Sequence, residues 1–344
     1  MALVRPRLND FYDLPFSQEQ VSFAIPLLDE DLPLYVDPFL LWKSPSQQDN
    51  SLHAQIINSF NHLGILFLKD RQDEAINLLI ELSECNEVGL GNSMTRKGLK
   101  IGQKTAVEIL SLFQNIPQVQ RSGFTHFEEV QLLIEGVAQD RISDIACNLL
   151  MSFLIDYTID ECKTWSIPTP KSHVNTYNCK SNQFETEDVD LPVNPETNRP
   201  VVLVPKRWLR FVTWINYSDF QEHYFAKHAD ADRFRDRVAI LNYNRNNYDM
   251  VQSYVAARES ARKDCSNDPL FRPIPIISMK RKTQALTTLK TGKTDNADKE
   301  YERLIAPILA SAMYPDLDFA ATQSRTISNV SYVTLYFTTT VPAI

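Results

Sequence analysis

The sequence predicts an α+β fold dominated by helices. Apolar residues recur at helical spacing over 51–82, over 126–157 and over 219–262, which is the pattern of amphipathic helices. Short β-branched runs, such as the one at 201–204, are typical of strands instead. Helices therefore outnumber strands in the expected architecture.

Changes in composition divide the chain of 344 residues into three parts. The length is sufficient for two domains. We expect a mainly helical body with short strands over 1–265, a basic linker over 266–296, and a smaller unit over 297–344.

Charge and hydropathy exclude some classes of function. The net charge is -8 and the pI is about 5.4, so a global basic field for nucleic acid is absent, although a local basic patch remains open. No run has the length of a signal peptide core or of a membrane span. The five cysteines are scattered without a CxxC pair, which favours free, mostly buried thiols and a cytoplasmic protein away from membranes.

The first 130 residues predict short elements and then helices. Five prolines within 15–45 exclude a long helix there. Two amphipathic helices follow over 51–82, with a break near Lys69. A further helix is expected to begin near Gln103.

Glycines concentrate in the stretch before that helix. Gly89, Gly91, Gly98 and Gly102 are four of the eight glycines in the chain, so this loop needs positive φ angles or close backbone approach. A glycine loop that leads into a helix can cradle an anion. The spacing differs from that of a phosphate loop, and a turn-rich connector is the favoured interpretation.

A second group of polar residues marks a predicted helix start. The group, which we call the helix-start cluster, consists of Asp140, Arg141, Ser143, Asp144 and Asn148. Asp140 or Ser143 is expected to cap the helix, and acids in its first turn suit the helix dipole. A polar functional site is the alternative. The apolar stripe continues to Tyr157, which predicts one continuous helix, while a loop or short β elements are expected over 166–198.

A small basic cluster follows the run at 201–204. Lys206, Arg207 and Arg210 surround Trp208 and could contact phosphate, although a solvated surface is the commoner arrangement. Downstream, His223 and His228 share no helix face with a third ligand, so no metal site is predicted.

The predicted linker carries a second basic group. Lys280, Arg281 and Lys282 lie in a stretch with no acid between Asp268 and Asp295, and they are candidate nucleic-acid contacts. An amphipathic helix and a strand-compatible tail come after the linker.

The segment "DKEYERLIAPILASAMYPDLDF" resembles the opening helix of restriction-endonuclease-like nucleases of the PD-(D/E)XK superfamily. The resemblance implies a first helix that leads into a core sheet, with Glu302 as a catalytic acid. It also implies Mg²⁺ held by carboxylates, and a lysine beside the attacking water.

Four upstream segments, "VDPFLLWKS", "NEVGLGNS", "DRISDIACNLL" and "NPETNRPVVLVPKRWL", are similar to an uncharacterised bacterial protein family with such a nuclease region at the C-terminus. This resemblance implies a role in defence against foreign DNA, such as that of phage.

The chain departs from the nuclease pattern after Arg325, where it has no acid and no lysine. The strand Asp and the acid-x-Lys pair of the family are therefore missing. A frameshift that truncates the catalytic module would explain the uncharged tail, and a genuine terminal strand is the competing explanation. Either way, we expect no cofactor in this chain, although an intact family nuclease would use Mg²⁺.

Two functions follow from these observations. The first is a bacterial nucleic-acid-targeting protein of a nuclease family whose catalytic module is truncated, with DNA as its partner. The alternative is a non-enzymatic binding or scaffold protein, whose helical body recognises a protein partner or a second copy of the chain. An unrelated enzyme that uses the glycine loop and the helix-start cluster has no nucleophile–base pair to support it.

Overall fold

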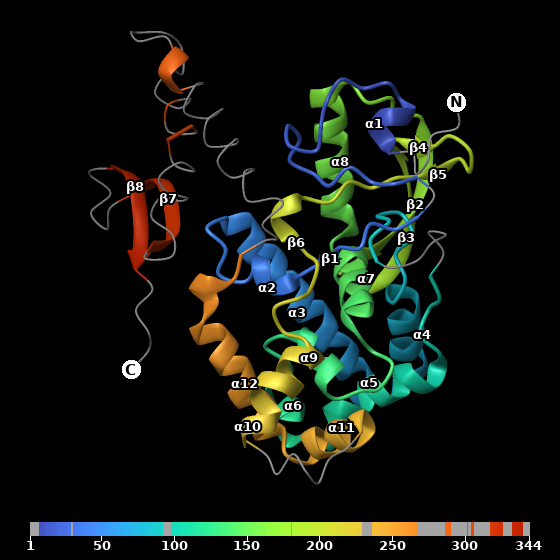
Figure 1. Cartoon of the computed structure of the whole chain (residues 1–344), viewed down its shortest axis with the longest axis vertical. Coiled ribbons are helices and arrows are strands. Elements are labelled where there is room, and N and C mark those ends of the chain that lie inside the picture. Colours follow the sequence, from blue (N-terminus) through green and yellow to red (C-terminus); the bar gives the residue numbers. More distant parts are fainter. Residues whose placement is uncertain are drawn as a thin grey trace.

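The computed structural model of the chain is shown in Figure 1. It describes residues 7–28, 30–91, 98–179, 181–228, 236–266, 286–289, 301, 304–305, 317–325 and 332–339. Helices make up most of this part of the chain and the strands are short, so the predicted helix-dominated α+β class is confirmed.

The helices follow the chain in this order: α1 (Leu8–Phe11), α2 (Pro38–Leu41), α3 (Gln47–Leu68), α4 (Gln72–Leu82), α5 (Gln103–Asn115), α6 (Pro117–Ser122), α7 (Gln139–Leu149), α8 (Met151–Trp165), α9 (Tyr217–Asp219), α10 (Ala226–His228), α11 (Arg237–Asn246) and α12 (Tyr248–Ser260). Shorter 3₁₀ turns are η1 (Phe127–Leu132), η2 (Lys206–Trp208) and η5 (Arg262–Asp264), and η3 (Phe220–Phe225) is a π-helix.

The strands form two-stranded antiparallel sheets. They pair as β1 (Tyr35–Val36) with β6 (Leu209–Arg210), β2 (Lys171–Asn178) with β3 (Gln183–Asp190), β4 (Val193–Asn194) with β5 (Arg199–Pro200), and β7 (Leu317–Arg325) with β8 (Tyr332–Thr339). Because β1 pairs with β6, the N-terminal segment is held against a segment far along the chain.

Several predicted elements are confirmed. The proline-rich stretch of 15–45 forms β1, the four-residue α2 and isolated bridges. The helix pair over 51–82 corresponds to α3 and α4, with the break at Lys69–Arg71, and α5 begins at Gln103. All five cysteines are free, and four of them are buried.

The helix expected to continue to Tyr157 is instead two helices. The chain bends by 76° between α7 and α8, at Leu150. Helix α7 lies in the main core, and the first turns of α8 add Met151, Leu154 and Ile155 to the same core. Further along α8, Cys162 packs in a second cluster with Leu8, Phe23 and Leu203. After the bend, α8 therefore runs from the main core to the second cluster.

The segment over 166–198 forms β elements, which is one of the two alternatives expected there, and β2 and β3 are each eight residues long. Val201–Val204 is buried as expected, but it joins no strand ladder. Its backbone bonds to separate partners: Leu203 N–H donates to Thr158 Oγ1 at 2.9 Å, and Val202 N–H donates to Glu87 O at 2.9 Å.

The C-terminal part is described only in pieces. Tyr301 and Leu304–Ile305 are helical, and β7 and β8 form an antiparallel hairpin, which lies apart from the helical body in Figure 1. The nuclease-like fold proposed for 297–344 stays a prediction, as do the domain limits. Lys280, Arg281, Lys282 and Glu302 lie outside the described residues.

Within the described residues, no single helix is long and apolar enough to cross a membrane. Helices α7 and α8 would be long and apolar enough together, but the 76° bend separates them.

Candidate functional site

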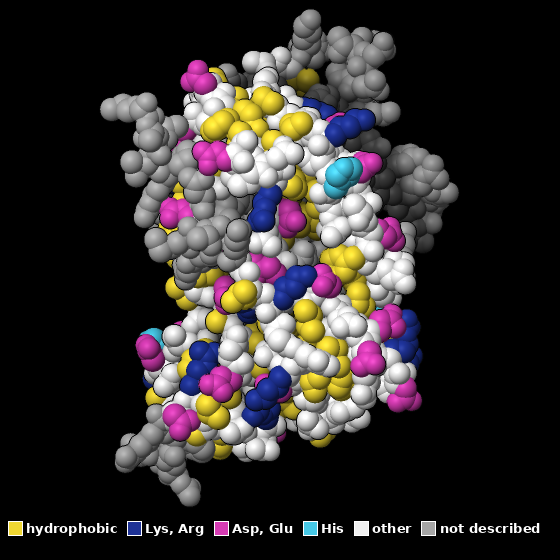
Figure 2. Space-filling model, turned by 90° about the vertical axis from the view of Figure 1, so that its right-hand side faces the viewer, with side chains coloured by type: hydrophobic (Ala, Val, Ile, Leu, Met, Phe, Trp, Pro, Cys, Tyr) yellow, Lys and Arg dark blue, Asp and Glu magenta, His cyan; other side chains and the backbone are white. Residues whose placement is uncertain are grey.

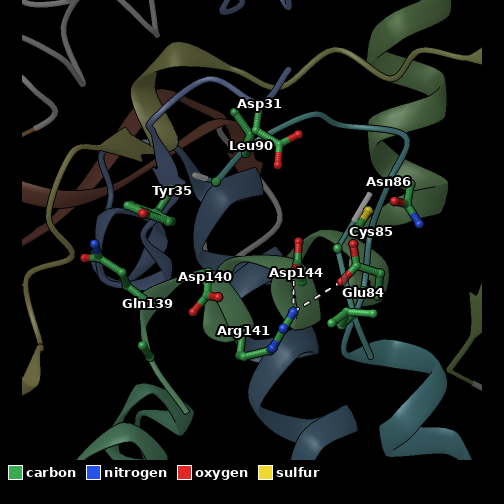
Figure 3. Close-up of a pocket in the computed structure, with 14 residues that line it drawn as sticks. Asp31, Tyr35, Glu84, Cys85, Asn86, Leu90, Gln139, Asp140, Arg141 and Asp144 are labelled. Carbon is green, nitrogen blue, oxygen red and sulfur yellow. Dashed lines mark hydrogen bonds and ion pairs between the residues drawn. The ribbon is translucent and has the colours of Figure 1, made fainter. Parts of the chain in front are cut away.

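A pocket of about 530 Å³ lies where three chain segments meet at the start of α7 (Figure 3). Asp31 and Tyr35 line it from the N-terminal segment, Glu84 from the end of α4, and Asp140, Arg141 and Asp144 from α7. We call it the α7 pocket. It unites the glycine loop with three of the five residues of the helix-start cluster.

Arg141 is the cationic side chain of the described pocket wall, and it is held by carboxylates. Its Nη1 lies 3.2 Å from Glu84 Oε2 and 3.5 Å from Asp144 Oδ2, and both contacts are drawn in Figure 3. The same nitrogen donates to the carbonyl of Ser83 at 3.4 Å. Two acids therefore converge on one guanidinium group.

Burial changes the protonation of these acids. It raises the pKa of the Glu84 carboxyl, and the nearby Arg141 charge offsets only part of the effect. Burial also raises the pKa of Asp144 well above its usual value, and the neighbouring Glu84 charge adds to that rise. Desolvation disfavours the ionised form of a carboxyl, so a further positive charge in the pocket would stabilise both ionised carboxylates.

The other two residues of the helix-start cluster position the pocket walls. The backbone N–H of Val36 donates to Ser143 Oγ at 3.0 Å. The Asn148 side chain donates to the carbonyls of Leu82 at 2.8 Å and of Glu84 at 2.9 Å. The predicted cap is wrong, because α7 begins after Ala138 with no side-chain cap. Ser143 is instead turned toward β1, where it satisfies a buried N–H.

Both roles expected of the glycines in this loop, positive φ angles and close approach, are confirmed. Gly89 and Gly91 have φ of 61° and 132°, values that favour glycine. A Cβ on Gly98 would lie 2.0 Å from Glu84 Oε1, so this glycine permits close approach to a pocket carboxylate. Gly102 has an extended backbone and open space around its Cα. Carboxylates repel an anion. A wall so rich in them is therefore unsuited to the bound anion that is the alternative function of the glycine loop.

The basic cluster near Trp208 has partners within the protein. Lys206 is fully buried, and its ammonium group donates to the carbonyl of Gln18. Arg207 forms a bidentate pair with Asp49, with both N···O distances 2.8 Å. Arg210 lies 3.5 Å from the buried Asp37. Lys206 has no exposed surface for a phosphate, and nucleic-acid binding by this cluster stays a prediction.

The charged side chains on the face shown in Figure 2 are also mixed in sign. Lysine and arginine side chains are interspersed there with aspartate and glutamate. The described surface of that face therefore presents no continuous basic area of the kind that follows a nucleic-acid backbone.

The pocket carboxylates do not fit the Mg²⁺ ion that the nuclease resemblance implies. The Arg141 guanidinium already occupies the position where Glu84 and Asp144 converge. Over the described ranges, no group of three or more His, Cys, Asp or Glu side chains is arranged to hold a metal ion. Glu302 lies outside these ranges.

A buried cluster of acids and histidines was not found by sequence reasoning. Glu128 is fully buried, and among the described residues neither of its carboxyl oxygens has a hydrogen-bond partner. Its Oε1 lies 4.0 Å from Nδ1 of the buried His126, whose Nε2 lies 3.0 Å from Glu259 Oε1. The dipeptide Glu128–Glu129 was the available signal, but the pattern also fits an exposed helix start.

Burial controls the charge in this cluster as well. It raises the pKa of Glu128 well above its usual value, and it raises the pKa of Glu129 to about 7 despite a hydrogen bond from Tyr248. Burial and the neighbouring His126 lower the pKa of His53 to about 3. Glu128, Glu129 and His53 are therefore mainly uncharged in the folded protein at mildly acidic pH.

Replacing Ser143 by alanine should lower the free energy of unfolding by about 1–3 kcal/mol, because the buried Val36 N–H loses its acceptor. Urea denaturation measures the loss, with Ser152→Ala on the exposed side of α8 as the control. Hydrogen exchange at the Val36 amide should accelerate in Ser143→Ala. Unchanged exchange at Val36 would contradict the assigned bond.

Glu129 should make the chain less stable as the pH rises. A carboxyl whose folded pKa is raised contributes stability that is fully present below its unfolded pKa, near 4.5, and is lost as the pH rises through about 7. Glu129→Gln should therefore reduce the fall in unfolding free energy across this window by on the order of 3 kcal/mol. Glu135→Gln, at an exposed position outside the buried cluster, serves as the control. Equal pH profiles for Glu129→Gln and the unmodified chain would refute this assignment.

Comparison with known proteins places the chain in one family. No curated protein and no solved structure matches it. Residues 13–216 match the model of a domain of unknown function, DUF8370, and this span contains every described residue of the α7 pocket. Because the match covers more than half of the chain, the chain belongs to the DUF8370 family.

Proposed function

We propose that this chain is a non-enzymatic binding protein, whose helical body recognises a positively charged group of a protein partner in the α7 pocket. One observation carries the proposal: four acids and one arginine line the described wall of a cavity of about 530 Å³. The acids are Asp31, Glu84, Asp140 and Asp144.

Arg141, which belongs to the chain itself, shows how the pocket carboxylates bind a cation. Glu84 and Asp144 already hold its guanidinium group, which indicates that the wall suits a planar cation with several N–H donors. Asp140 is half-buried on the same turn of α7 and pairs with no described side chain. Asp140 is therefore the carboxylate that a second cation would contact.

Protonation supplies a further argument. The pKa values of Glu84 and Asp144 are raised by burial, and a bound cation would favour their ionised forms. Binding would then release protons. Affinity for the cation should consequently increase with pH over the range in which these carboxyls titrate.

The rim of the pocket favours a protein partner over a free small cation. Leu99 lines the pocket and is 80% exposed, so its apolar surface is available to a ligand. An apolar residue beside the cation in a partner segment could cover Leu99. The expected ligand is thus an arginine side chain with an apolar neighbour.

Peptides that differ only in one central residue provide the test. We expect a peptide with a central arginine next to leucine to bind, and the same peptide with uncharged citrulline to bind at least tenfold more weakly. Asp140→Asn should weaken arginine-peptide binding about five- to tenfold. The matched control is Asp160→Asn, which changes an acid with an 80% exposed side chain on α8.

Titration calorimetry at pH 5 and pH 7 should show tighter binding of the arginine peptide at the higher pH. Equal affinities for arginine and citrulline peptides would refute the proposal. So would equal effects of Asp140→Asn and Asp160→Asn.

The order of the described C-terminal elements favours a second candidate function. Helical residues at Tyr301 and Leu304–Ile305 precede the antiparallel strands β7 and β8, and the nuclease resemblance implies a helix that leads into a sheet. This candidate is a nucleic-acid-targeting protein of a nuclease family. Its catalytic carboxylates and lysine are not all present, because no acid or lysine follows Asp318.

For this second candidate, we expect the 344-residue protein to bind DNA without cleaving it in Mg²⁺. Lys280, Arg281 and Lys282 should be replaced by alanine together. The slope of log K for DNA binding against log salt concentration should then become shallower by about two to three, at roughly 0.9 per phosphate contact. Cleavage of plasmid DNA that Glu302→Ala abolishes would contradict the expected inactivity. Absence of DNA binding would exclude this second candidate.

A further inference from the structure

A second cavity, of about 580 Å³, lies at the other end of the body from α1, where α6, α10, α11 and α12 meet (Figure 1). Its wall includes Tyr224 and His228 from η3 and α10, and Tyr243, Asn246 and Asn247 at the junction of α11 and α12. We call it the α11 groove. Most of its residues lie beyond the span that matches the DUF8370 model.

One wall of the groove is a stack of aromatic rings. The rings of Tyr224 and His228 have centroids 4.2 Å apart and planes within 20°. On its inner side Tyr224 contacts the buried Tyr254, with centroids 5.5 Å apart, so the stack rests on the core. His228 is exposed at the outer end, where a further planar ring can continue the stack.

The backbone beneath the stack has an uncommon conformation. Tyr224 belongs to the π-helix η3, which runs directly into α10 and His228. Such π-turns are rare and are frequent at functional sites. Here the π-helix contains Tyr224, which stacks on His228 of the adjoining α10.

The junction of α11 and α12 adds hydrogen-bond acceptors to the wall of the groove. The side-chain nitrogens of Asn246 and Asn247 donate back to the carbonyls of Asn242 and Tyr243, each at 2.9 Å. This leaves the amide oxygens to accept from a ligand. Asp249 adds a carboxylate, one oxygen of which accepts from Gln118 at 2.8 Å. A ligand in the groove should therefore be planar and should present N–H donors.

The charges in the groove argue against a phosphate as the recognised group. The arginine in the wall, Arg245, donates to the carbonyl of Leu133 at 2.6 Å and also to Asn242 Oδ1. Asp249 contributes an opposite charge to the same wall. Recognition by this groove must then come from stacking and from hydrogen bonds to a ring edge.

We infer that the α11 groove binds an unpaired nucleobase with an exocyclic amino group, such as cytosine or adenine. The base stacks on His228, and its amino group donates to the amide oxygens of Asn246 and Asn247. Uracil and thymine carry a carbonyl in place of that amino group, so the acceptor wall disfavours them. This inference is independent of the cation proposed for the α7 pocket.

Fluorescein-labelled twelve-nucleotide strands of dC and of dU provide the first test. Cytosine and uracil have nearly the same shape but differ at the 4-position, which is an amino group in cytosine and a carbonyl in uracil, and at N3, which carries a proton only in uracil. With the full chain we expect dC to bind about tenfold more tightly than dU, within the range for a good base-edge contact. A duplex of the same length should bind more weakly than single-stranded dC, since its bases are already stacked. Free cytidine, used as a competitor, distinguishes recognition of the nucleoside alone from recognition of a strand.

Variants of His228 and of the nearby exposed His223 provide the second test. His228→Ala should weaken dC binding about tenfold, the range for loss of one stacking partner, and His228→Phe should restore it to within about threefold. His223→Ala is the matched control, because His223 has a 68% exposed side chain on the same segment and does not line the groove. Asp140→Asn in the α7 pocket should leave dC binding unchanged.

Several outcomes would overturn the inference: equal binding of dC and dU, equal binding of duplex and single strand, displacement of dC by a neutral oligosaccharide, or no effect of His228→Ala. Failure of dC to bind at all would also overturn it, whatever the arginine peptide does in the α7 pocket.

Discussion

The burial of α7 in the core is the constraint on which the rest of the structure depends. The buried polar side chains of a helix need partners, and those of α7 find them on segments that are distant in sequence. Ser143 accepts from β1, Asn148 donates to the end of α4, and Arg141 pairs with Glu84. The contacts that satisfy α7 therefore also join the N-terminal segment, the glycine loop and the helical core, and the α7 pocket lies at their junction.

Desolvation explains why the carboxyl groups at this junction favour a nearby cation. Carboxyl groups at a buried junction lose hydration, so their ionised forms become less favourable and a neighbouring cation more valuable. Arg141 supplies part of that compensation for Glu84 and Asp144. The α11 groove relies on different physics, because its charges are balanced and its aromatic and amide groups are fixed by contacts with their own helices. The two sites should thus respond differently to pH and to salt.

A buried carboxyl group, that of Asp37, also connects distant segments of the helical body. Asp37 caps α2 through the N–H of Phe39, accepts from the N–H of Trp214 at 2.7 Å, and lies 3.5 Å from Arg210. Arg210 and Arg207 therefore have structural partners, although their spacing in the sequence resembles a phosphate-binding cluster. A basic residue becomes available to a ligand only if the fold leaves its charge uncompensated.

The local pattern of residues in the sequence determined much of the secondary structure of this protein. Periodicity predicted α3, α4 and α5, prolines excluded a long early helix, and the glycine loop received the positive φ angles and the close approach that glycine permits. The sequence also brought Asp140, Arg141 and Asp144 together, because they occupy neighbouring turns of one helix. Tertiary structure alone decided the 76° bend after α7, the pairing of Ser143 with Val36, and the meeting of Glu84 with Arg141. The physical reason is that a helix or a turn depends on neighbours in the chain, whereas a buried polar group takes its partner from whichever segment the packing of the core brings within reach.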